Sequence, residues 1–315
     1  MIDRRDALKL ALCSATALAA PAALAQSPAK PRTKIVFLGT KGGPRVDVGP
    51  SNPANLVVVN DTPFVIDCGM GVSRQLASAG VPLASVKYIL ISHHHSDHNL
   101  EYGNLVYNAW AAGLSTPIHS FGPKGLEAMT RTYWELNKFD VETRIEDEGR
   151  PDPRNLLIAK DIADEGIVLQ TADVKVTAFR TPHPPIMDNF AYKFETPDGV
   201  IVFSSDTAYN PKLAEFAKGA DVLVHEALYV PWVDRLVARV KNGATLKKHL
   251  LESHTAVEDV GKIAAAAGVK VLVLSHFVPG DDPLVTDDNW TEDVKKNFSG
   301  RIVVAKDLMQ LALPV

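Results

Sequence analysis

The sequence predicts an α/β fold in a single domain, and two observations carry that prediction. Short apolar segments with strand character alternate with segments whose apolar residues have helical spacing, down to a last helix at 291–298 and a last strand at 301–305. Residues 27–315 also form one stretch of about 290 residues, which is long enough for one large domain with its own core.

Residues 1–26 have the features of an export signal. Arg4 and Arg5 precede an alanine-rich apolar stretch, and Ala-Leu-Ala at 23–25 has the small-residue pattern of a cleavage site. The paired arginines are typical of a twin-arginine signal, with an ordinary secretory signal as the alternative. The apolar stretch is short for a membrane anchor, which needs about 20 residues. We expect a periplasmic or secreted protein with no membrane association beyond export.

Charge and cysteine content narrow the classes of function. The whole chain has a net charge of −4, and loss of the predicted signal brings it to about −5. An acidic chain is a poor match for the phosphate backbone of nucleic acids, so we expect no nucleic acid partner. Cys68 has no second cysteine outside the predicted signal, which excludes a disulfide framework.

The first predicted elements lead to one dense block of polar residues. Strands are expected at 34–40, 56–59, 64–67 and 88–91. A loop rich in glycine and proline lies at 41–55, and a helix is expected at 72–79. The run at 88–91 is apolar throughout, as in strands that are covered on both faces.

An HxHxDH motif follows the strand at 88–91. Its members are His93, His95, Asp97 and His98. Neutral imidazole and carboxylate are ligands of divalent ions such as zinc, and four of them so close together can serve two adjacent metals. A chance polyhistidine tract is the alternative, but this tract is interrupted by Ser96 and Asp97 and follows a strand. The motif therefore predicts a metal site at the rim of a sheet.

The HxHxDH motif resembles the signature of the metallo-β-lactamase-fold hydrolases, and the resemblance covers residues from about 34 to 304. It implies a four-layer αββα sandwich, with two β-sheets face to face, helices outside and the active site along the sheet edges. It also implies three further metal ligands, each after an apolar strand. These are His183, Asp206 and His276.

The resemblance assigns a role to each ligand. The first metal would be bound by His93, His95 and His183, the second by Asp97, His98 and His276, and Asp206 would bridge both. The expected cofactors are two divalent metal ions, with zinc as the first choice. Asp67 would support a metal-binding histidine by hydrogen bonding, and a helix N-cap or turn is its alternative role.

Two later motifs resemble the ribonuclease Z and arylsulfatase-like branch of the family. They are His225-Glu226-Ala227 and Ser253-His254-Thr255. The resemblance implies that Glu226 and His254 lie beside the metals, with His254 as a proton donor or oxyanion stabiliser. Asp97 is the third predicted catalytic residue. Helix capping is the alternative role of His254.

Three other regions have structural or open interpretations. Residues 140–166 are charged and contain prolines, which predicts a surface excursion. They lack the basic, glycine-rich arm with which ribonuclease Z grips transfer RNA, and this argues against tRNA processing. Residues 231–251 have helical spacing and form either a lid or substrate wall, or a packing or dimer face. His119 is expected to be structural.

The predicted function is an exported binuclear zinc hydrolase of small ester anions. Aryl sulfates come first, because residues 183–185 and 275–283 look most like the arylsulfatase-like branch. Phosphodiesters and phosphotriesters are the near alternative, followed by lactones and β-lactams. Outside hydrolysis, the alternatives are a di-iron redox protein and, last, a non-catalytic metal-binding protein. A homodimer is left open.

Overall fold

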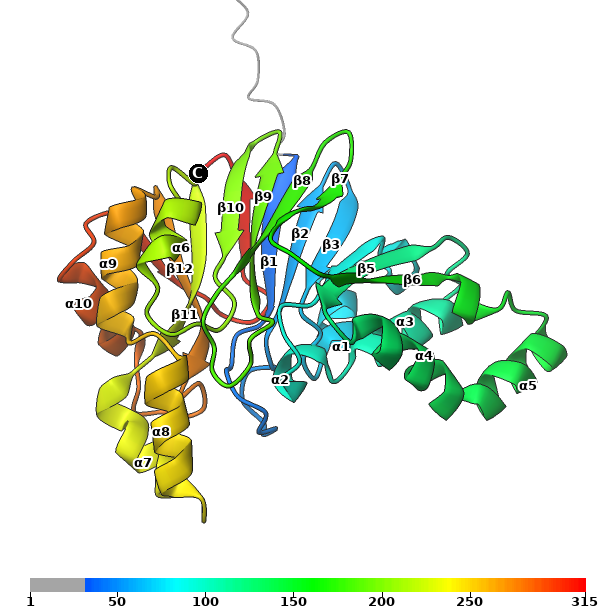
Figure 1. Cartoon of the computed structure of the whole chain (residues 1–315). Helices are drawn as coiled ribbons and strands as arrows, with labels where there is room; N and C mark the ends of the chain where they lie inside the picture. The colour runs from blue at the N-terminus through cyan, green and yellow to red at the C-terminus, as the bar shows by residue number, and fades with distance from the viewer. Residues whose placement is uncertain (1–31) are drawn as a thin grey trace, which may run out of the picture. The chain divides into compact units, whose positions relative to one another are not determined.

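Two mixed β-sheets form the centre of residues 32–315, the part of the chain that the computed structural model describes (Figure 1). The first sheet has the strand order β14-β1-β2-β3-β4-β5-β6. Its strands are β1 Thr33–Gly39, β2 Ala54–Val59, β3 Thr62–Ile66, β4 Tyr88–Leu90, β5 Ile118–Pro123, β6 Leu157–Ile162 and β14 Gln310–Leu313. Strands β3 to β6 pair in parallel, whereas the pairs from β14 to β3 are antiparallel.

The second sheet repeats this division into a parallel and an antiparallel half. Its order is β13-β12-β11-β10-β9-β8-β7. Its strands are β7 Gly166–Gln170, β8 Lys175–Arg180, β9 Phe190–Thr196, β10 Gly199–Phe203, β11 Val222–Leu228, β12 Val271–Val278 and β13 Arg301–Val304. Strands β10 to β13 are parallel, and the pairs from β10 to β7 are antiparallel.

Helices cover the outer faces of both sheets (Figure 1). The helices of the first half are α1 Val72–Ser78, α2 Ser96–Asn99, α3 Tyr102–Ala111, α4 Leu126–Leu136 and α5 Lys138–Glu148. Those of the second half are α6 Pro211–Phe216, α7 Val233–Val237, α8 Gly243–Ser253, α9 Val257–Ala267 and α10 Asp287–Lys295. Short 3-10 turns occur as η1 Leu83–Ser85, η2 Pro153–Asn155 and η3 Val230–Trp232. The expected αββα sandwich is therefore confirmed.

Alternating side chains assign each central strand to an inner and an outer core. In β1, Ile35 and Phe37 pack between the two sheets, while Val36 and Leu38 pack against the helices of the first sheet. Successive residues of a strand point to opposite faces, so a strand that is covered on both sides is apolar at every position. This pattern explains why the central strands could be predicted from apolar runs in the sequence.

Residues 140–166 contain most of α5 and all of the edge strand β6, two elements not predicted from the sequence. Their charges face solvent along α5, where Val141 is the buried residue, as a surface excursion requires. One local expectation is wrong and concerns His276, which was expected after the end of its strand. Strand β12 continues to Val278, and His276 sits at a bulge inside it.

None of the helices in residues 32–315 combines the length and the apolar character that crossing a membrane requires.

Replacing Phe194 with Ala should destabilise the protein strongly. Phe194 is completely buried between the sheets and packs edge-on against Phe64 and Phe203. The cavity left by the ring should lower the free energy of unfolding by about 3–5 kcal/mol, measured by urea denaturation. Phe139→Ala is the matched control, because Phe139 is 85% exposed on α5, and it should change stability by less than about 0.5 kcal/mol. Equal effects of both substitutions would contradict this assignment of the core.

Candidate metal centre

The strand ends of the two parallel half-sheets bring the predicted ligands to one place. His93 and His95 follow β4 in extended backbone, and the short helix α2 then carries Asp97 and His98. From the second sheet, Asp206 follows β10. Ligand sites of α/β proteins commonly lie at the carboxyl ends of parallel strands.

Two further ligand candidates complete the set. His183 lies in the loop between β8 and β9, and His276 lies in the bulge of β12. With the exception of His95, which is half-buried, the seven predicted ligands are buried.

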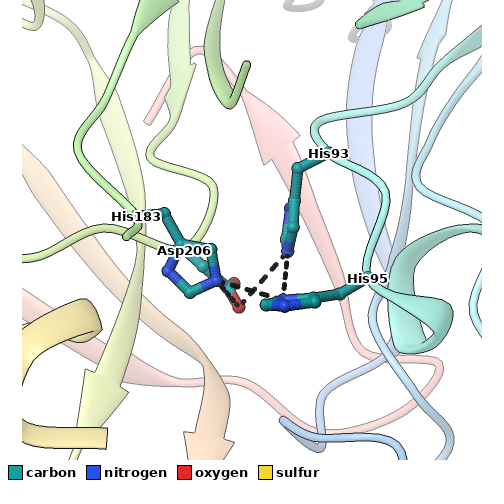
Figure 2. Close-up of side chains that lie close together, drawn as sticks. All are labelled: His93, His95, His183 and Asp206. Carbon is teal, nitrogen blue, oxygen red and sulfur yellow. Dashed lines mark hydrogen bonds and ion pairs between the residues drawn. The ribbon is translucent and has the colours of Figure 1, made fainter. Parts of the chain in front are cut away.

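The first predicted ligand set converges on a single point (Figure 2). His95 Nδ1 lies 3.0 Å from His93 Nε2 and 3.1 Å from His183 Nε2. The carboxylate oxygen Oδ2 of Asp206 lies 3.9 Å from the Nε2 atoms of both His93 and His183. Three ring nitrogens and one carboxylate oxygen therefore face a common space.

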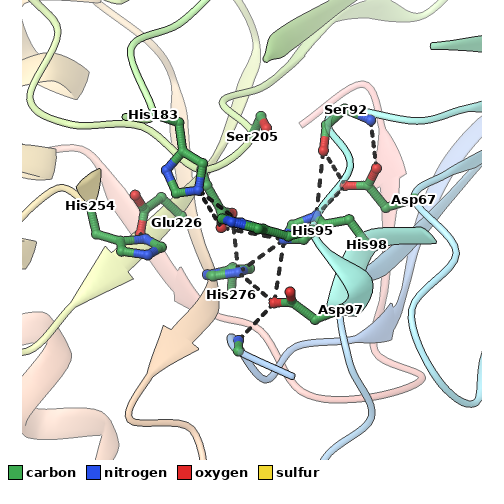
Figure 3. A network of polar contacts seen from close by, with 12 residues as sticks. Asp67, Ser92, His95, Asp97, His98, His183, Ser205, Glu226, His254 and His276 are labelled. Atoms are coloured by element: carbon green, nitrogen blue, oxygen red, sulfur yellow. Dashed lines mark hydrogen bonds and ion pairs between the residues drawn. The ribbon is translucent and has the colours of Figure 1, made fainter. Parts of the chain in front are cut away.

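The second predicted set lies directly beside the first (Figure 3). His98 Nε2 and His276 Nε2 are 3.2 Å apart, and Asp97 Oδ2 lies 3.6 Å from the first and 3.7 Å from the second. Asp206 reaches this group as well, with Oδ2 3.3 Å from His98 Nε2 and Oδ1 3.1 Å from His276 Nε2. Asp206 thus stands between the two sets, where a bridging carboxylate is expected.

Hydrogen bonds that Asp67 accepts, directly from His98 and through Ser92 for His93, determine which ring nitrogen of each histidine faces the centre. Figure 3 shows Asp67 with Ser92 and His98. Asp67 Oδ2 accepts from His98 Nδ1 at 2.8 Å and from Ser92 Oγ at 2.9 Å. Because the Ser92 hydroxyl has donated its only proton, it can only accept from His93 Nδ1, which lies 3.0 Å away. Both rings therefore carry a proton on Nδ1 and face the centre with Nε2, the atom that would bind a metal.

A backbone carbonyl fixes the tautomer of the third histidine. His183 Nδ1 lies 2.8 Å from the carbonyl oxygen of Ser253, which can only accept. His183 must donate from Nδ1, so its Nε2 also presents a lone pair to the centre. The hydrogen bonding expected of Asp67 is present, and Ser253 gives His183 an equivalent partner.

Burial and charge divide the histidines into two electrostatic groups. Burial lowers the pKa of His95 to about 4, and the neighbouring His183 adds to this effect. Burial likewise opposes the charged forms of His98 and His276. The carboxylates of Asp206 and Asp97, with Asp67 in the case of His98, together outweigh it and raise the pKa of His98 and, to about 10, that of His276. The first group therefore stays neutral, whereas the buried carboxylates of the second group attract positive charge.

The donor set suits divalent cations. His93 Nε2 and His183 Nε2 both face His95 Nδ1, at 3.0 and 3.1 Å. His95 Nδ1 can carry one proton at most, so the three nitrogens cannot all be paired by hydrogen bonds among themselves. Buried carboxylates beside them require compensating positive charge. A pair of divalent ions would satisfy both requirements, through imidazole nitrogen in the first set and mixed nitrogen and oxygen ligands in the second.

Glu226 and His254 form a connected pair beside this centre (Figure 3). Glu226 Oε2 accepts from His254 Nδ1 at 3.1 Å, while Oε1 accepts from the backbone N–H groups of Thr207 and Thr255 at 3.0 and 3.1 Å. His254 caps no helix through its side chain, because the N-terminus of α9 has no side-chain cap. Glu226 therefore positions His254, whose Nε2 remains for a substrate.

A pocket of about 270 Å³ opens above the centre. Asp97, Asp206, His254 and His276 lie on its polar side, and the apolar side comes from the region 231–251. This region is therefore a wall of the pocket, one of the two roles left open by its sequence.

Two residues of the pocket were not singled out from the sequence, namely His249 and Arg45. His249 lies on α8, five residues before His254, and a histidine in an otherwise ordinary helical segment gave only a weak signal. Arg45 lies in the loop rich in glycine and proline, and among residues 32–315 its guanidinium forms no hydrogen bond or ion pair. His119, by contrast, lies on β5 and does not line the pocket.

Comparison with known proteins gives three kinds of match. The sequence model of the beta-lactamase superfamily domain matches residues 62–277. Ribonuclease Z of Mycolicibacterium gilvum is 27% identical over 87% of this chain and 94% of its own length. Ribonuclease Z of Mycobacterium bovis is 29% identical over 87% of this chain and 96% of its own length.

Solved structures share the fold at low sequence identity. The short form of human tRNase Z has a TM-score of 0.64 at 18% identity and covers 90% of this chain and 100% of its own. Zn(2+)-bound PqqB from Methylobacterium extorquens has a TM-score of 0.65 at 14% identity and covers 89% and 100%. Metallo-β-lactamase-fold proteins usually bind divalent metals, often zinc, which agrees with the donor set described above.

These relatives overturn part of the functional prediction. A hydrolase of aryl sulfates and other small ester anions, with no nucleic acid partner, is wrong, because the relatives that match most of this chain are ribonucleases. The predicted export signal at residues 1–26 lies outside the described residues, and export stays a prediction. The exclusion of nucleic acid rested on the charge of the whole chain, which says little about the charge around one pocket. The preference for aryl sulfates rested on the likeness of residues 183–185 and 275–283, two short segments that do not determine a substrate. What stands is a hydrolase of the metallo-β-lactamase fold.

Replacing His95 with Ala should reduce metal binding. His95 Nδ1 is the nitrogen that lies close to both His93 and His183, so its loss breaks the first ligand set. After metal loading and dialysis, the variant should retain fewer metal ions per chain than the wild type by plasma mass spectrometry. His119→Ala is the control and should bind as many ions as the wild type. Wild-type metal content in His95→Ala would remove His95 from the ligands.

Proposed function

We propose that this chain, which belongs to the beta-lactamase superfamily, is a metal-dependent phosphodiesterase whose substrate is RNA. The observation that carries the proposal is the Glu226–His254 pair, which holds an imidazole in the pocket beside the predicted ligands of two metals. The names of the ribonuclease Z relatives support RNA as the substrate class. This chain aligns with nearly the whole length of each of these relatives, so the similarity is not confined to one motif.

Two divalent ions, zinc in our proposal, would be held by the two sets of side chains described above. His93, His95 and His183 would bind one ion, Asp97, His98 and His276 the other, and Asp206 both. Bound ions of this kind supply Lewis acidity and lower the pKa of water. The protein's own contribution is to fix the ligand tautomers through Asp67, Ser92 and the Ser253 carbonyl.

His254 is suited to deliver a proton to the leaving oxygen. Burial opposes the charged imidazole, but the Glu226 carboxylate outweighs it and raises the pKa of His254. When water attacks phosphorus, the bond from phosphorus to the leaving oxygen breaks, and the proton on His254 Nε2 neutralises the departing alkoxide. The proton that the attacking water loses passes to bulk water, from which His254 regains its own. Glu226 keeps the ring in place through His254 Nδ1 and balances its charge.

Cationic groups near the pocket mouth suit a phosphodiester anion. The Lys41 ammonium donates to the Arg45 carbonyl oxygen at 2.8 Å and pairs with Asp47, which braces the loop. Arg45 lines the same pocket, and its guanidinium has no ion pair within residues 32–315. A planar guanidinium matches two phosphate oxygens well. The pocket thus offers positive charge although the whole chain is acidic.

The test of the proposal is metal-dependent cleavage of RNA. The zinc-loaded protein should cleave a single-stranded RNA oligonucleotide and bis(4-nitrophenyl) phosphate, and a chelator should abolish both activities. 4-Nitrophenyl sulfate serves as the comparison ester and should react more slowly. Chelator-resistant cleavage, or no cleavage of either diester, would refute the proposal.

Replacing His254 with Ala should harm RNA cleavage more than cleavage of an activated diester. The ribose hydroxyl that leaves from RNA needs a proton, so the rate constant kcat should fall by about 10²- to 10⁴-fold. 4-Nitrophenolate leaves without a proton, so the rate with bis(4-nitrophenyl) phosphate should fall much less. Metal content should stay at the wild-type value. An equal loss with both substrates would exclude His254 as the proton donor.

A further inference from the structure

The apolar wall of the pocket is formed largely by residues 230–253, a helical segment that we call the cap. It contains η3, α7 and α8 and lies between β11 and α9 in the sequence (Figure 1, yellow). Leu250 and Val233 of the cap pack with Leu228 and Val278 in a small apolar cluster of their own. The cap therefore has its own anchor and does not belong to the main cores.

Ion pairs fix the cap to the loop that follows the metal-site strand β12. Arg235 Nε and an Arg239 guanidinium nitrogen lie 2.9 and 2.7 Å from Asp282 Oδ2. The side chain of Asp282 is almost completely buried, and a buried carboxylate with two guanidinium partners holds its neighbours firmly. The position of the cap is thus tied to the strand that carries His276.

The pocket between the cap and the centre has two chemically different sides. Leu236, Leu246 and Leu250 of the cap, with Val278 and Pro279, provide the apolar side. His95, Asp206 and His254 lie on the polar side. A volume of about 270 Å³ is at the small end of ligand pockets, so the pocket admits one flat apolar group with a short polar attachment and excludes a duplex.

His249 is the polar group that the cap itself contributes. Its ring centroid lies 5.9 Å from that of His95 and 5.8 Å from that of His254. The Ser253 hydroxyl donates to the Pro184 carbonyl oxygen at 2.6 Å, so toward His249 Nδ1, at 3.2 Å, it can only accept. His249 therefore carries its proton on Nδ1, and Nε2 is left as a hydrogen-bond acceptor.

We propose that the cap forms a single-nucleotide subsite, in which a nucleobase packs on Leu236, Leu246 and Leu250 while His249 Nε2 accepts a hydrogen bond from a ribose hydroxyl. This inference rests on the proposed RNA substrate and specifies which part of it the pocket holds. Because His249 Nε2 would accept this hydrogen bond from the sugar hydroxyl, the subsite should bind a ribonucleotide more tightly than a nucleotide whose sugar lacks that hydroxyl. The subsite holds one unpaired nucleotide beside the scissile phosphate.

Binding of free nucleotides tests this subsite without catalysis. Adenosine 5′-monophosphate and its 2′,3′-dideoxy analogue would be titrated into the zinc-loaded protein by calorimetry. The wild type should bind the ribonucleotide about threefold to tenfold more tightly, the contribution of one hydrogen bond. His249→Ala should abolish this preference by weakening only the ribonucleotide. Leu246→Ala should weaken both nucleotides by a similar factor.

Matched variants separate the subsite from general damage. His119→Ala and Leu136→Ala replace a histidine and a leucine away from the pocket and should leave both affinities unchanged. An unchanged ribonucleotide preference in His249→Ala would overturn the inference, as would loss of metal from that variant, because His249 would then be a ligand.

The two proposals fail in different ways. If the wild type cleaves RNA but neither nucleotide binds, the subsite is refuted while the proposed function stands. If nucleotides bind as expected but RNA is not cleaved, the subsite is supported and the proposed function fails.

Discussion

The Asp67 carboxylate is the interaction on which the order of the centre depends. It receives the Ser92 backbone N–H and hydroxyl on one side and His98 on the other, so one side chain fixes where the HxHxDH segment leaves β4. Through Ser92 it also sets the proton on His93. Without this carboxylate, His93 and His98 could each adopt the wrong tautomer, and a nitrogen that carries a proton cannot bind a metal. A single buried acid at the end of β3 thus prepares ligands for both predicted ions.

The same centre contains backbone strain that the surrounding sheets must hold. Asp67, Ser205 and His276 have φ values of 62°, 58° and 49°, in the left-handed region that residues with a Cβ seldom occupy. Each such residue costs about 1–3 kcal/mol and persists only where neighbouring structure determines it. The Ser205 hydroxyl donates to Asn189 Oδ1 at 2.8 Å, which helps to hold the turn. Strain and ligands occur together because the rigid strand ends of two sheets impose both.

Features that depend on neighbouring residues could be predicted from the sequence, whereas features that depend on contacts between distant parts of the chain could not. The HxHxDH motif and the apolar strands are local patterns, so the α/β class and the first four candidate ligands could be predicted from them. The αββα arrangement and the grouping of all seven ligands were predicted through the family resemblance that the motif carries. The bulge that keeps His276 inside β12 depends on pairing with β11 and has no local signature. His249 becomes part of the pocket only because the cap folds over the centre. The sequence did not single out Arg45 for a related reason. The net charge of the chain counts acidic residues on remote surfaces, and solvent ions screen those residues from the pocket.

The division of the ligands between the two sheets makes the chain's two halves depend on each other. Four ligand candidates follow β4 of the first sheet, while His183, Asp206 and His276 come from the second. The nearest of these three, His183, lies 85 residues after His98. Neither sheet alone could hold a complete set for either ion. Cations bound here would act as a staple across a very long loop, and such links restrict the unfolded chain more than short ones do. A fragment that ended between the halves would lose its reactive centre entirely, so a cut that separates the halves would inactivate both pieces.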